Sequence, residues 1–394
     1  MKPVYLDYNA TTPIDPEVAA AMQPYLLEHF GNPSSSHWYG QHTTQAVATA
    51  RQQVADLLQC DPDEVIFTSG GSESNNYAIK GTALAHRERG HHIITSAIEH
   101  PAVIEVCKYL ETQGFEVTYL PVDTYGMVQL ESLERALSPQ TILVTIMHAN
   151  NEVGTVQPIA EIAALAKQHG IVVHTDAAQS VGKIPTSVDT LGVHLLSIAG
   201  HKVYAPKGVG ALYSRRGTRL QKLIHGADHE RNLRAGTENV LGIVGLGQAC
   251  DIARRDMAHN TARMQKTRDR LAAGLQQLVA AAKVHGHPTQ RLPNTLSISF
   301  PHIEANRLLA ALEDIAASSG AACHADSVDV SSVLAAMHVP LEYAMGTLRF
   351  STGRMTTEAE IDQAIRTLGQ AVQHLTPETP RPGGGGIGDR PRLC

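Results

Sequence analysis

The sequence has few cysteines and no long apolar run, and these absences exclude several classes of protein. Five cysteines stand among 394 residues, an odd number without a Cys-x-x-Cys pair, which argues against a disulfide framework and against a zinc site. The first residues lack the apolar segment of a secretion signal, and no stretch approaches the ~20 apolar residues that span a bilayer. We therefore expect a cytoplasmic protein that binds no metal and no membrane.

Excess positive charge is also absent. The formal net charge is -6, which opposes binding to a polyanion, so we expect no nucleic-acid partner. A hydrophobic content of 43% and a charged content of 18% are those of an ordinary globular protein. The chain is long enough for one large domain and a smaller one.

The order of apolar segments indicates the fold class. From about residue 44 to 215, short β-branched runs such as VIFTS, TILVTIM and GIVVHTD alternate with helix-like segments, which predicts an α/β protein with a mostly parallel sheet. We expect a large domain at residues 15–261 and a small α/β domain at residues 1–14 and 262–376. The Pro/Gly-rich tail, residues 377–394, should be disordered.

Ligands of open α/β sheets bind beyond the carboxyl ends of the strands, and the first such end carries GGSESNN. Gly71 and Ser72 there open a helix, whose free N–H groups favour an anion such as phosphate. An ordinary helix cap by the serine is the alternative.

Two charged residues close later strand-like runs. Asp176 follows GIVVHT; it either pairs with a cation or several donors, because an unpaired buried carboxylate is costly, or caps the next helix. Lys202 follows HLLSIAGH and is a candidate to form an imine with a carbonyl ligand. The alternative for Lys202 is a long side chain that reaches solvent at the edge of a strand.

The combination of these groups favours one cofactor. A phosphate cup, a carboxylate for a protonated pyridine nitrogen and a lysine for an aldehyde are what pyridoxal 5'-phosphate requires. His100, in IITSAIEHPAV, is placed to stack on a flat ring or to move protons, or is a plain loop histidine. We therefore expect the large domain to bind this cofactor.

Nine segments resemble the cysteine desulfurases, which belong to the fold-type I, class V aminotransferase-like enzymes that use pyridoxal phosphate. From residue 5 to about 354, in the same order as in that family, the segments are YLDYNATTP, FGNPSS, FTSGGSESNN, HANNEVGTVQPI, HTDAAQSVGK, GHKVYAPKGVGALY, HERNLRAGTENV, SSGAAC and LRFSTGR. The resemblance thus covers nearly all of the chain except the tail.

The resemblance implies roles for the cofactor site. Lys202 would bind the cofactor aldehyde, Asp176 the pyridine nitrogen and Gln179 the ring hydroxyl, and His100 would stack on the ring and act in catalysis. The residues implied in binding the phosphate are Gly71, Ser72, His201 and, from a second subunit, Thr237. Such a shared site implies a homodimer.

The resemblance also implies how the substrate is held and used. Asn151, which would touch the cofactor as well, and Arg349 would bind the substrate carboxylate. Cys323, behind the small residues of SSGAAC, would be the nucleophile on a mobile loop, taking sulfur from L-cysteine as a persulfide and leaving L-alanine. The sulfur would pass to an acceptor protein for iron–sulfur cluster assembly or thiolation. Whether His324 helps to deprotonate Cys323 stays open.

Two positions depart from the family pattern. Ala199 stands where the family commonly has a hydroxyl, so one phosphate hydrogen bond should be missing and cofactor affinity should fall by roughly 1 kcal/mol. Ala227 and Asp228 replace part of a glycine run, which leaves the local loop shape open and suggests that Asp228 points away from the phosphate.

Three other functions remain open at this stage. GAACHAD, VLAAMHVP and Ala199 also resemble selenocysteine lyase, which would release selenium and alanine from L-selenocysteine at the same site. A transaminase or β-lyase would leave Cys323 unused. A non-catalytic scaffold would retain the cofactor site without activity, although the presence of Lys202, Asp176 and Cys323 argues against it.

Overall fold

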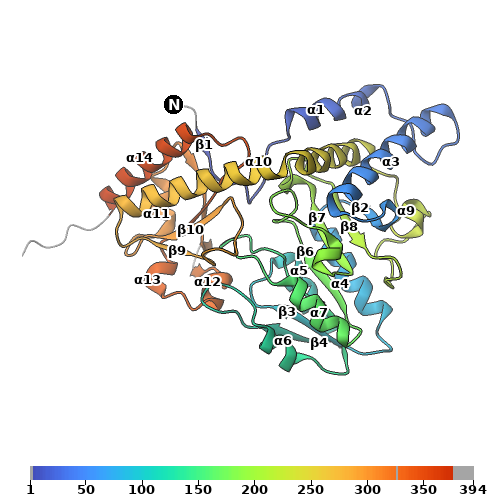
Figure 1. Ribbon diagram of the computed structural model, residues 1–394, viewed down its shortest axis with the longest axis horizontal. Coiled ribbons are helices and arrows are strands. Elements are labelled where there is room, and N and C mark those ends of the chain that lie inside the picture. The colour runs from blue at the N-terminus through green and yellow to red at the C-terminus, as the bar shows by residue number, and fades with distance from the viewer. Residues whose placement is uncertain (1–2, 325–326, 376–394) are drawn as a thin grey trace, which may run out of the picture.

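The computed structural model describes residues 3–324 and 327–375, and for residues 321–324 and 327–329 it describes the backbone alone. A larger and a smaller α/β unit are joined by one long helix (Figure 1). No helix within these described ranges is long and apolar enough to cross a bilayer. The predicted disordered tail lies outside the described residues.

A seven-stranded sheet forms the larger unit, and its strands are the β-branched runs of the sequence. In spatial order they are β2 (Val65–Thr68), β8 (Gly210–Ser214), β7 (Leu195–Ala199), β6 (Val172–Asp176), β5 (Thr141–Thr145), β3 (His92–Ser96) and β4 (Glu116–Leu120). Strand β8 is antiparallel to both of its neighbours, and the other pairs are parallel. The prediction of an α/β fold with a mostly parallel sheet is confirmed.

Helices cover both faces of this sheet. The helices of the larger unit are α1 (Pro16–Met22), α2 (Pro24–Leu27), α3 (Trp38–Leu58), α4 (Gly71–Ala85), α5 (Pro101–Thr112), α6 (Leu130–Ala136), α7 (Ile159–Gln168), α8 (Val188–Leu191) and α9 (His229–Asn232), of which α4 and α5 cover one face and α3 and α7 the other. Ile93 packs in the core that α4 and α5 cover, whereas its neighbour Ile94 packs in the core that α3 and α7 cover, because successive strand residues point to opposite faces. Burial on both faces explains why the runs are almost continuously apolar.

The smaller unit is built on a four-stranded antiparallel sheet. Its strands, in spatial order, are β12 (Ser318–Ser319), β15 (Thr347–Ser351), β10 (Thr295–Ser299) and β9 (Lys283–His285). Beside it, β1 (Val4–Tyr5) pairs in parallel with β11 (Ile315–Ala316). The helices of this unit are α11 (Ala305–Ala310), α12 (Ser332–Ala336), α13 (Leu341–Ala344) and α14 (Glu358–Leu375).

Helix α10 (Val240–Leu278), 39 residues long, connects the two units. Ile243 and Leu246 near its start pack in the core of the large sheet, whereas Leu271 and Leu275 near its end pack with the small sheet. The N-terminal residues Val4 and Leu6 join this second core. Val333 and Leu334 of α12, by contrast, pack in the core of the large sheet, and the predicted division at residues 15 and 262 stays a prediction.

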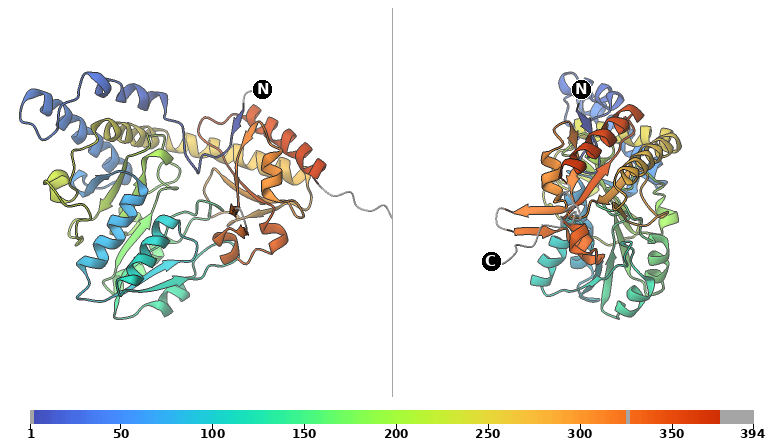
Figure 2. Two further views of the ribbon diagram at one scale, coloured as in Figure 1. Left: turned by 180° about the vertical axis from the view of Figure 1, so that it is seen from behind. Right: turned by 90° about the vertical axis from the view of Figure 1, so that its left-hand side faces the viewer.

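The segment that carries Cys323 forms a hairpin. Strands β13 (Ala321–His324) and β14 (Ser327–Val330) pair antiparallel as a sheet of their own. In the right-hand view of Figure 2 the two orange strands project from the body of the molecule. The small residues of SSGAAC predict a loop here, and main-chain pairing instead gives the segment a regular form.

Candidate active site

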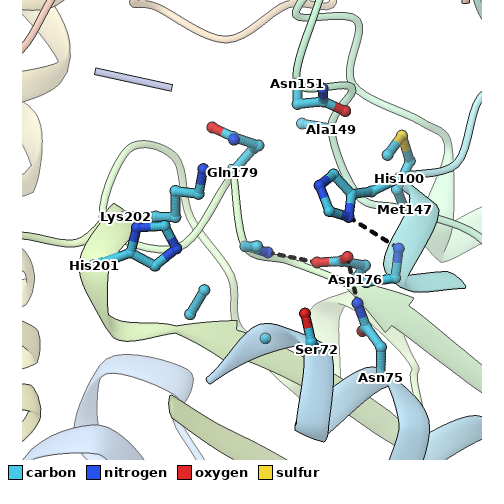
Figure 3. Close-up of a pocket in the computed structure, with 14 residues that line it drawn as sticks. Ser72, Asn75, His100, Met147, Ala149, Asn151, Asp176, Gln179, His201 and Lys202 are labelled. Atoms are coloured by element: carbon cyan, nitrogen blue, oxygen red, sulfur yellow. Dashed lines mark hydrogen bonds between the residues drawn. The ribbon is translucent and has the colours of Figure 1, made fainter. Parts of the chain in front are cut away.

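A cavity of about 270 Å³ lies at the carboxyl ends of β6 and β7, between these strands and the start of α4. Figure 3 shows the side chains around it. The residues that line it are Gly71, Ser72, Asn75, His100, Ala102, Met147, Ala149, Asn151, Asp176, Ala178, Gln179, Ala199, His201 and Lys202. The structure thus brings together, from widely separated segments, most of the predicted site residues.

Asp176, the last residue of β6, is buried and has two donors. Its carboxylate accepts hydrogen bonds from Asn75 Nδ2 at 2.7 Å and from the main-chain N–H of Ala178 at 2.9 Å. These donors offset the cost of burying the carboxylate and fix its direction along the cavity floor (Figure 3). No helix follows directly, so the alternative of a helix cap is wrong.

Lys202 ends a short 3-10 turn, Gly200–Lys202, that follows β7. Its Nζ donates to the main-chain oxygens of Asn9 at 2.5 Å and Ala10 at 2.8 Å. Burial, and then the charge of Arg349, lower the pKa of Lys202 to about 8. A lysine in this range supplies a larger share of neutral amine near pH 7, which is the form that attacks a carbonyl.

His100 is the N-cap of α5, and its ring edge is open to the cavity. Its Nδ1 accepts from the main-chain N–H of Ala102 at 3.1 Å, so in the neutral ring the proton is on Nε2. Burial, and then the charge of Lys202, lower the pKa of His100 against the opposite effect of Asp176. The neutral imidazole therefore presents a flat face and one N–H donor.

The anion-binding end of the cavity is the start of α4, which is a 15-residue helix. Gly71 and Ser72 are its first residues, where free N–H groups and the helix dipole favour an anion. A Cβ at Gly71 would come within 3.1 Å of the Ala199 Cβ, so glycine keeps this end open. Burial lowers the pKa of His201 to about 4, and its Nδ1 contacts Thr11 Oγ1 at 3.2 Å.

Arg349, on β15, does not line the cavity but lies next to it. Its Nη1 donates to the Asn151 main-chain oxygen at 3.1 Å, and its Nη2 donates to Asp7 Oδ1 and Ser318 Oγ, each at 2.8 Å. The guanidinium thus links the small unit to the cavity wall, and its buried Nε–H is left without a partner among the described residues.

Thr237 and Cys323 are not brought into this cavity within one chain. Thr237 lines a separate hollow of about 150 Å³ that Glu230 and Arg234 also line. For Cys323, the backbone alone is described, opposite Val328 in the hairpin, so its distance from the cavity stays open.

Of the two departures, Ala199 lines the anion-binding end of the cavity, and the predicted loss of a phosphate hydrogen bond stays a prediction. Asp228 is exposed and does not line the cavity.

Sequence reasoning missed several residues of the site. Asn75 lies three residues after Ser72, so helical spacing was the signal that places both on one face of α4. Asn9 had no such signal, because the N-terminal segment reaches Lys202 only through the tertiary fold. Met147, Ala149 and Ala178 are also in the wall.

Comparisons with known proteins agree with this geometry. Residues 4–364 match the family model of aminotransferase class-V. Cysteine desulfurase IscS of Dictyoglomus turgidum is 48% identical over 379 residues, which are 96% of each chain. Cysteine desulfurase IscS of Methanosarcina thermophila is 49% identical over 385 residues, which are 96% of this chain and 95% of the relative.

Two solved structures extend the comparison. A NifS-like protein has a TM-score of 0.90 and 40% identity, covering 95% of this chain and 100% of its own. DndA from Streptomyces lividans has a TM-score of 0.75 and 38% identity, covering 87% of this chain and 97% of its own. The predicted family is confirmed, and the chain belongs to the aminotransferase class-V family, in its cysteine desulfurase branch.

Proposed function

We propose that this protein is a cysteine desulfurase, which converts L-cysteine to L-alanine and receives the sulfur on Cys323. One observation carries the proposal: a lysine with a lowered pKa, a buried carboxylate and a helix N-terminus face one cavity. The names of the relatives support the same activity.

The cavity fits pyridoxal 5'-phosphate, the cofactor of this family. The start of α4 at Gly71, which a Cβ would narrow, would take the phosphate together with Ser72 and His201. Asp176 would hold the pyridine nitrogen, whose proton its carboxylate stabilises. When bound, the cofactor supplies an electron sink for the charge that forms when the substrate loses its α-proton.

The remaining wall residues would orient the ring and move protons. Lys202 would bind the cofactor aldehyde through Nζ, and its pKa of about 8 lets the freed amine carry a proton near neutral pH. His100 would cover one face of the ring and offer Nε2–H above it. Gln179 would donate to the ring hydroxyl oxygen.

Substrate binding involves Arg349 and Asn151. The Nε of Arg349 has no hydrogen-bond partner among the described residues, which supports a carboxylate as an added ligand, because guanidinium N–H groups bind carboxylates strongly. Asp7 already accepts from Nη2, so the substrate carboxylate would share the guanidinium with it. Asn151, in the cavity wall, would contact the cofactor and the substrate from the same side.

Cys323 would be the sulfur acceptor. Its thiolate attacks the substrate sulfur, so an S–S bond forms as the C–S bond breaks, and the carbon fragment is protonated to L-alanine. One sulfur atom moves from L-cysteine to the enzyme, and no outside oxidant is needed. Delivery of that sulfur to an acceptor protein, for iron–sulfur cluster assembly or thiolation, completes the cycle in the cytoplasm.

A homodimer completes the site in this proposal. Thr237 of one subunit would reach the phosphate in the cavity of the other. Exposed apolar side chains on the outer segment from α2 to α3, namely Leu27 at 85%, Phe30 at 69% and Trp38 at 60% of their full exposure, support a covered face there. Sedimentation of the holoenzyme tests the dimer.

The test of the function is incubation with L-cysteine, followed by measurement of alanine and of the mass of the Cys323 peptide. We expect alanine and the mass increase of one sulfur atom, with neither in Lys202→Ala. Alanine with an unmodified Cys323, or no alanine at all, would overturn the proposal. The relatives named above are cysteine desulfurases and not selenocysteine lyases. A kcat/KM for L-selenocysteine at least about a hundredfold above that for L-cysteine, with negligible persulfide on Cys323, would restore that alternative.

A further inference from the structure

Lys183 is a buried lysine that the proposed chemistry leaves without a role. Its side chain lies behind the cavity wall, and the residue is 4% exposed. Burial, and then the charges of Lys202 and Arg349, lower the pKa of Lys183 to about 7. Burying an amine without hydrogen-bond partners costs free energy. The partners of Lys183 therefore indicate its role.

Among the described residues, the Lys183 Nζ has two hydrogen-bond partners, and both are side-chain amides. It donates to Gln179 Oε1 at 3.0 Å and to Asn9 Oδ1 at 3.3 Å. Gln179 lines the cavity and lies beside Lys202 in Figure 3. Lys183 therefore acts on the cavity through Gln179, from the side away from the ligand.

The network determines which way each amide points. Asn9 Nδ2 donates to the main-chain oxygen of Asn151 at 3.1 Å, and that oxygen can only accept. Asn9 Oδ1 must then face Lys183, and it also accepts from Asn294 Nδ2 at 2.9 Å.

Gln179 is held in the same manner from both ends. Its Nε2 donates to the main-chain oxygen of Asn9 at 2.9 Å, which again only accepts, so Oε1 must face Lys183. One hydrogen of Nε2 is used in this bond, and the second is left for the cavity. The arrangement is the same for a charged or a neutral lysine, because either form carries N–H donors.

We propose that Lys183 is a positioning residue of the cofactor site, which holds Gln179 so that an amide N–H faces the ring hydroxyl oxygen of bound pyridoxal phosphate. This inference rests on the proposed function and deepens it. Without Lys183, Oε1 would lack its donor in a buried place, and the amide would turn to find another. A donor at the ring oxygen stabilises its negative charge and so favours loss of the neighbouring imine proton.

The test is the pH midpoint of the visible absorption of bound pyridoxal phosphate in Lys183→Met. We expect the midpoint to rise by about half to one pH unit, because one donor to a charged oxygen is lost. Gln179→Leu should raise it in the same direction. The double variant should rise no further than the larger single one, because both changes remove the same contact.

Controls separate this role from a structural one. Lys167→Met, at an exposed position on α7, should leave the midpoint unchanged. Where Lys183→Met does not fold, Lys183→Gln decides, because its side chain is one bond shorter and cannot reach both acceptors. We expect a smaller shift in the same direction.

The outcomes distinguish the inference from the proposed function. A wild-type protein with no visible band after addition of pyridoxal phosphate would overturn the proposed function itself. A wild-type band with an unchanged midpoint in the folded Lys183 variants, and only a lower melting temperature, would overturn the inference alone. So would shifts of Lys183→Met and Gln179→Leu that add fully in the double variant.

Discussion

The wall of the cavity and the segment that carries Cys323 are built in opposite ways. In the wall, Asp176 ends a central strand and has two fixed donors, and Lys202 follows the next strand and is held by two main-chain oxygens. The cysteine segment pairs, within the described part of the chain, only with itself in a two-stranded hairpin. The residues proposed to hold the cofactor are thus fixed in place, whereas the proposed sulfur acceptor, Cys323, lies in a hairpin that is attached at its base.

The base of that hairpin is held on both sides by carboxylates outside the cavity lining. On one side, Ser318 Oγ donates to Asp7 Oδ1 at 2.8 Å. On the other side, the N-cap of α12, Ser331, donates to the carboxylate of Glu152, which follows Asn151. The main-chain N–H of Ser331 also donates to the Gly320 oxygen at 3.0 Å and closes the base.

This difference fits a division of labour. Breaking the C–S bond needs groups that are preorganised around the reacting atoms. To pass the sulfur to another protein, the thiol has to reach first the bound substrate and then the acceptor protein. The described residues anchor the hairpin at its base and place its strands outside the large and small sheets, so changes in the wall and in the hairpin should give separable defects.

The largest defect should come from the cavity wall. Lys202→Ala removes the amine that would bind the cofactor and move the proton, so we expect alanine formation to fall by roughly a thousandfold or more. Borohydride should no longer fix the cofactor to the chain, as mass measurement of the reduced protein would report. Backbone exchange of the hairpin should stay as in the wild type. Full activity in Lys202→Ala would contradict the assignment of the chemistry to the cavity wall.

The hairpin should give the opposite pattern. Cys323→Ser leaves the wall intact, so the visible band of the bound cofactor and its change on addition of L-cysteine should persist. Turnover to alanine should fall by about a hundredfold, since hydroxyl is a poor sulfur acceptor and solution thiols replace it inefficiently. A loss of the cofactor band in this variant would show that the two regions are not independent.

Arg349 lies where the regions meet, and its effect should be intermediate. Arg349→Lys keeps the charge but loses the fork that contacts Asn151, Asp7 and Ser318, so we expect KM for L-cysteine to rise about 10- to 100-fold with a smaller change in kcat. Steady-state kinetics measures both. A fall in kcat alone would assign Arg349 to the hairpin base and not to the substrate.

The sequence predicts the rigid region better than the hairpin. Continuous β-branched runs identify the strands of the large sheet, and parallel strands bring Asp176 and the residues after Ala199 to one edge. Fixed topology thus turns residues far apart in sequence into neighbours. The strand pairing of Ala321–His324 has no comparable signal, because small residues favour no strand and no tight-turn pair marks the bend.

The supports of the site were also beyond sequence reasoning. Asn9, in the N-terminal segment, contacts Lys202, Gln179 and Lys183. These contacts depend on how the first strand packs on the small unit. In the sequence, Lys183 is a polar residue that follows a helix-like segment. Its burial results from the tertiary fold. Such contacts follow from the packing of whole units and have no local pattern.

A fall in pH should destabilise the large and the small sheet alike, and this is the smallest of the expected effects. His174 on β6 bridges Thr145 Oγ1 at 2.8 Å and Ser197 Oγ at 2.9 Å, and His285 on β9 contacts Ser299 Oγ. Burial lowers the pKa of His174 to about 3, and burial and Lys283 lower that of His285 to about 4.

Because the unfolded chain holds these protons at a higher pH, near the ordinary value of about 6.5, the native state loses stability as the pH falls below it. Urea unfolding followed by circular dichroism should give a lower free energy of unfolding at pH 5 than at pH 7. His174→Gln and His285→Gln should each reduce that difference by roughly 1–2 kcal/mol, since the amide keeps a hydrogen bond and takes no proton. If only one of the two variants changed the dependence of the unfolding free energy on pH, the large and the small sheet would differ in their sensitivity to acid.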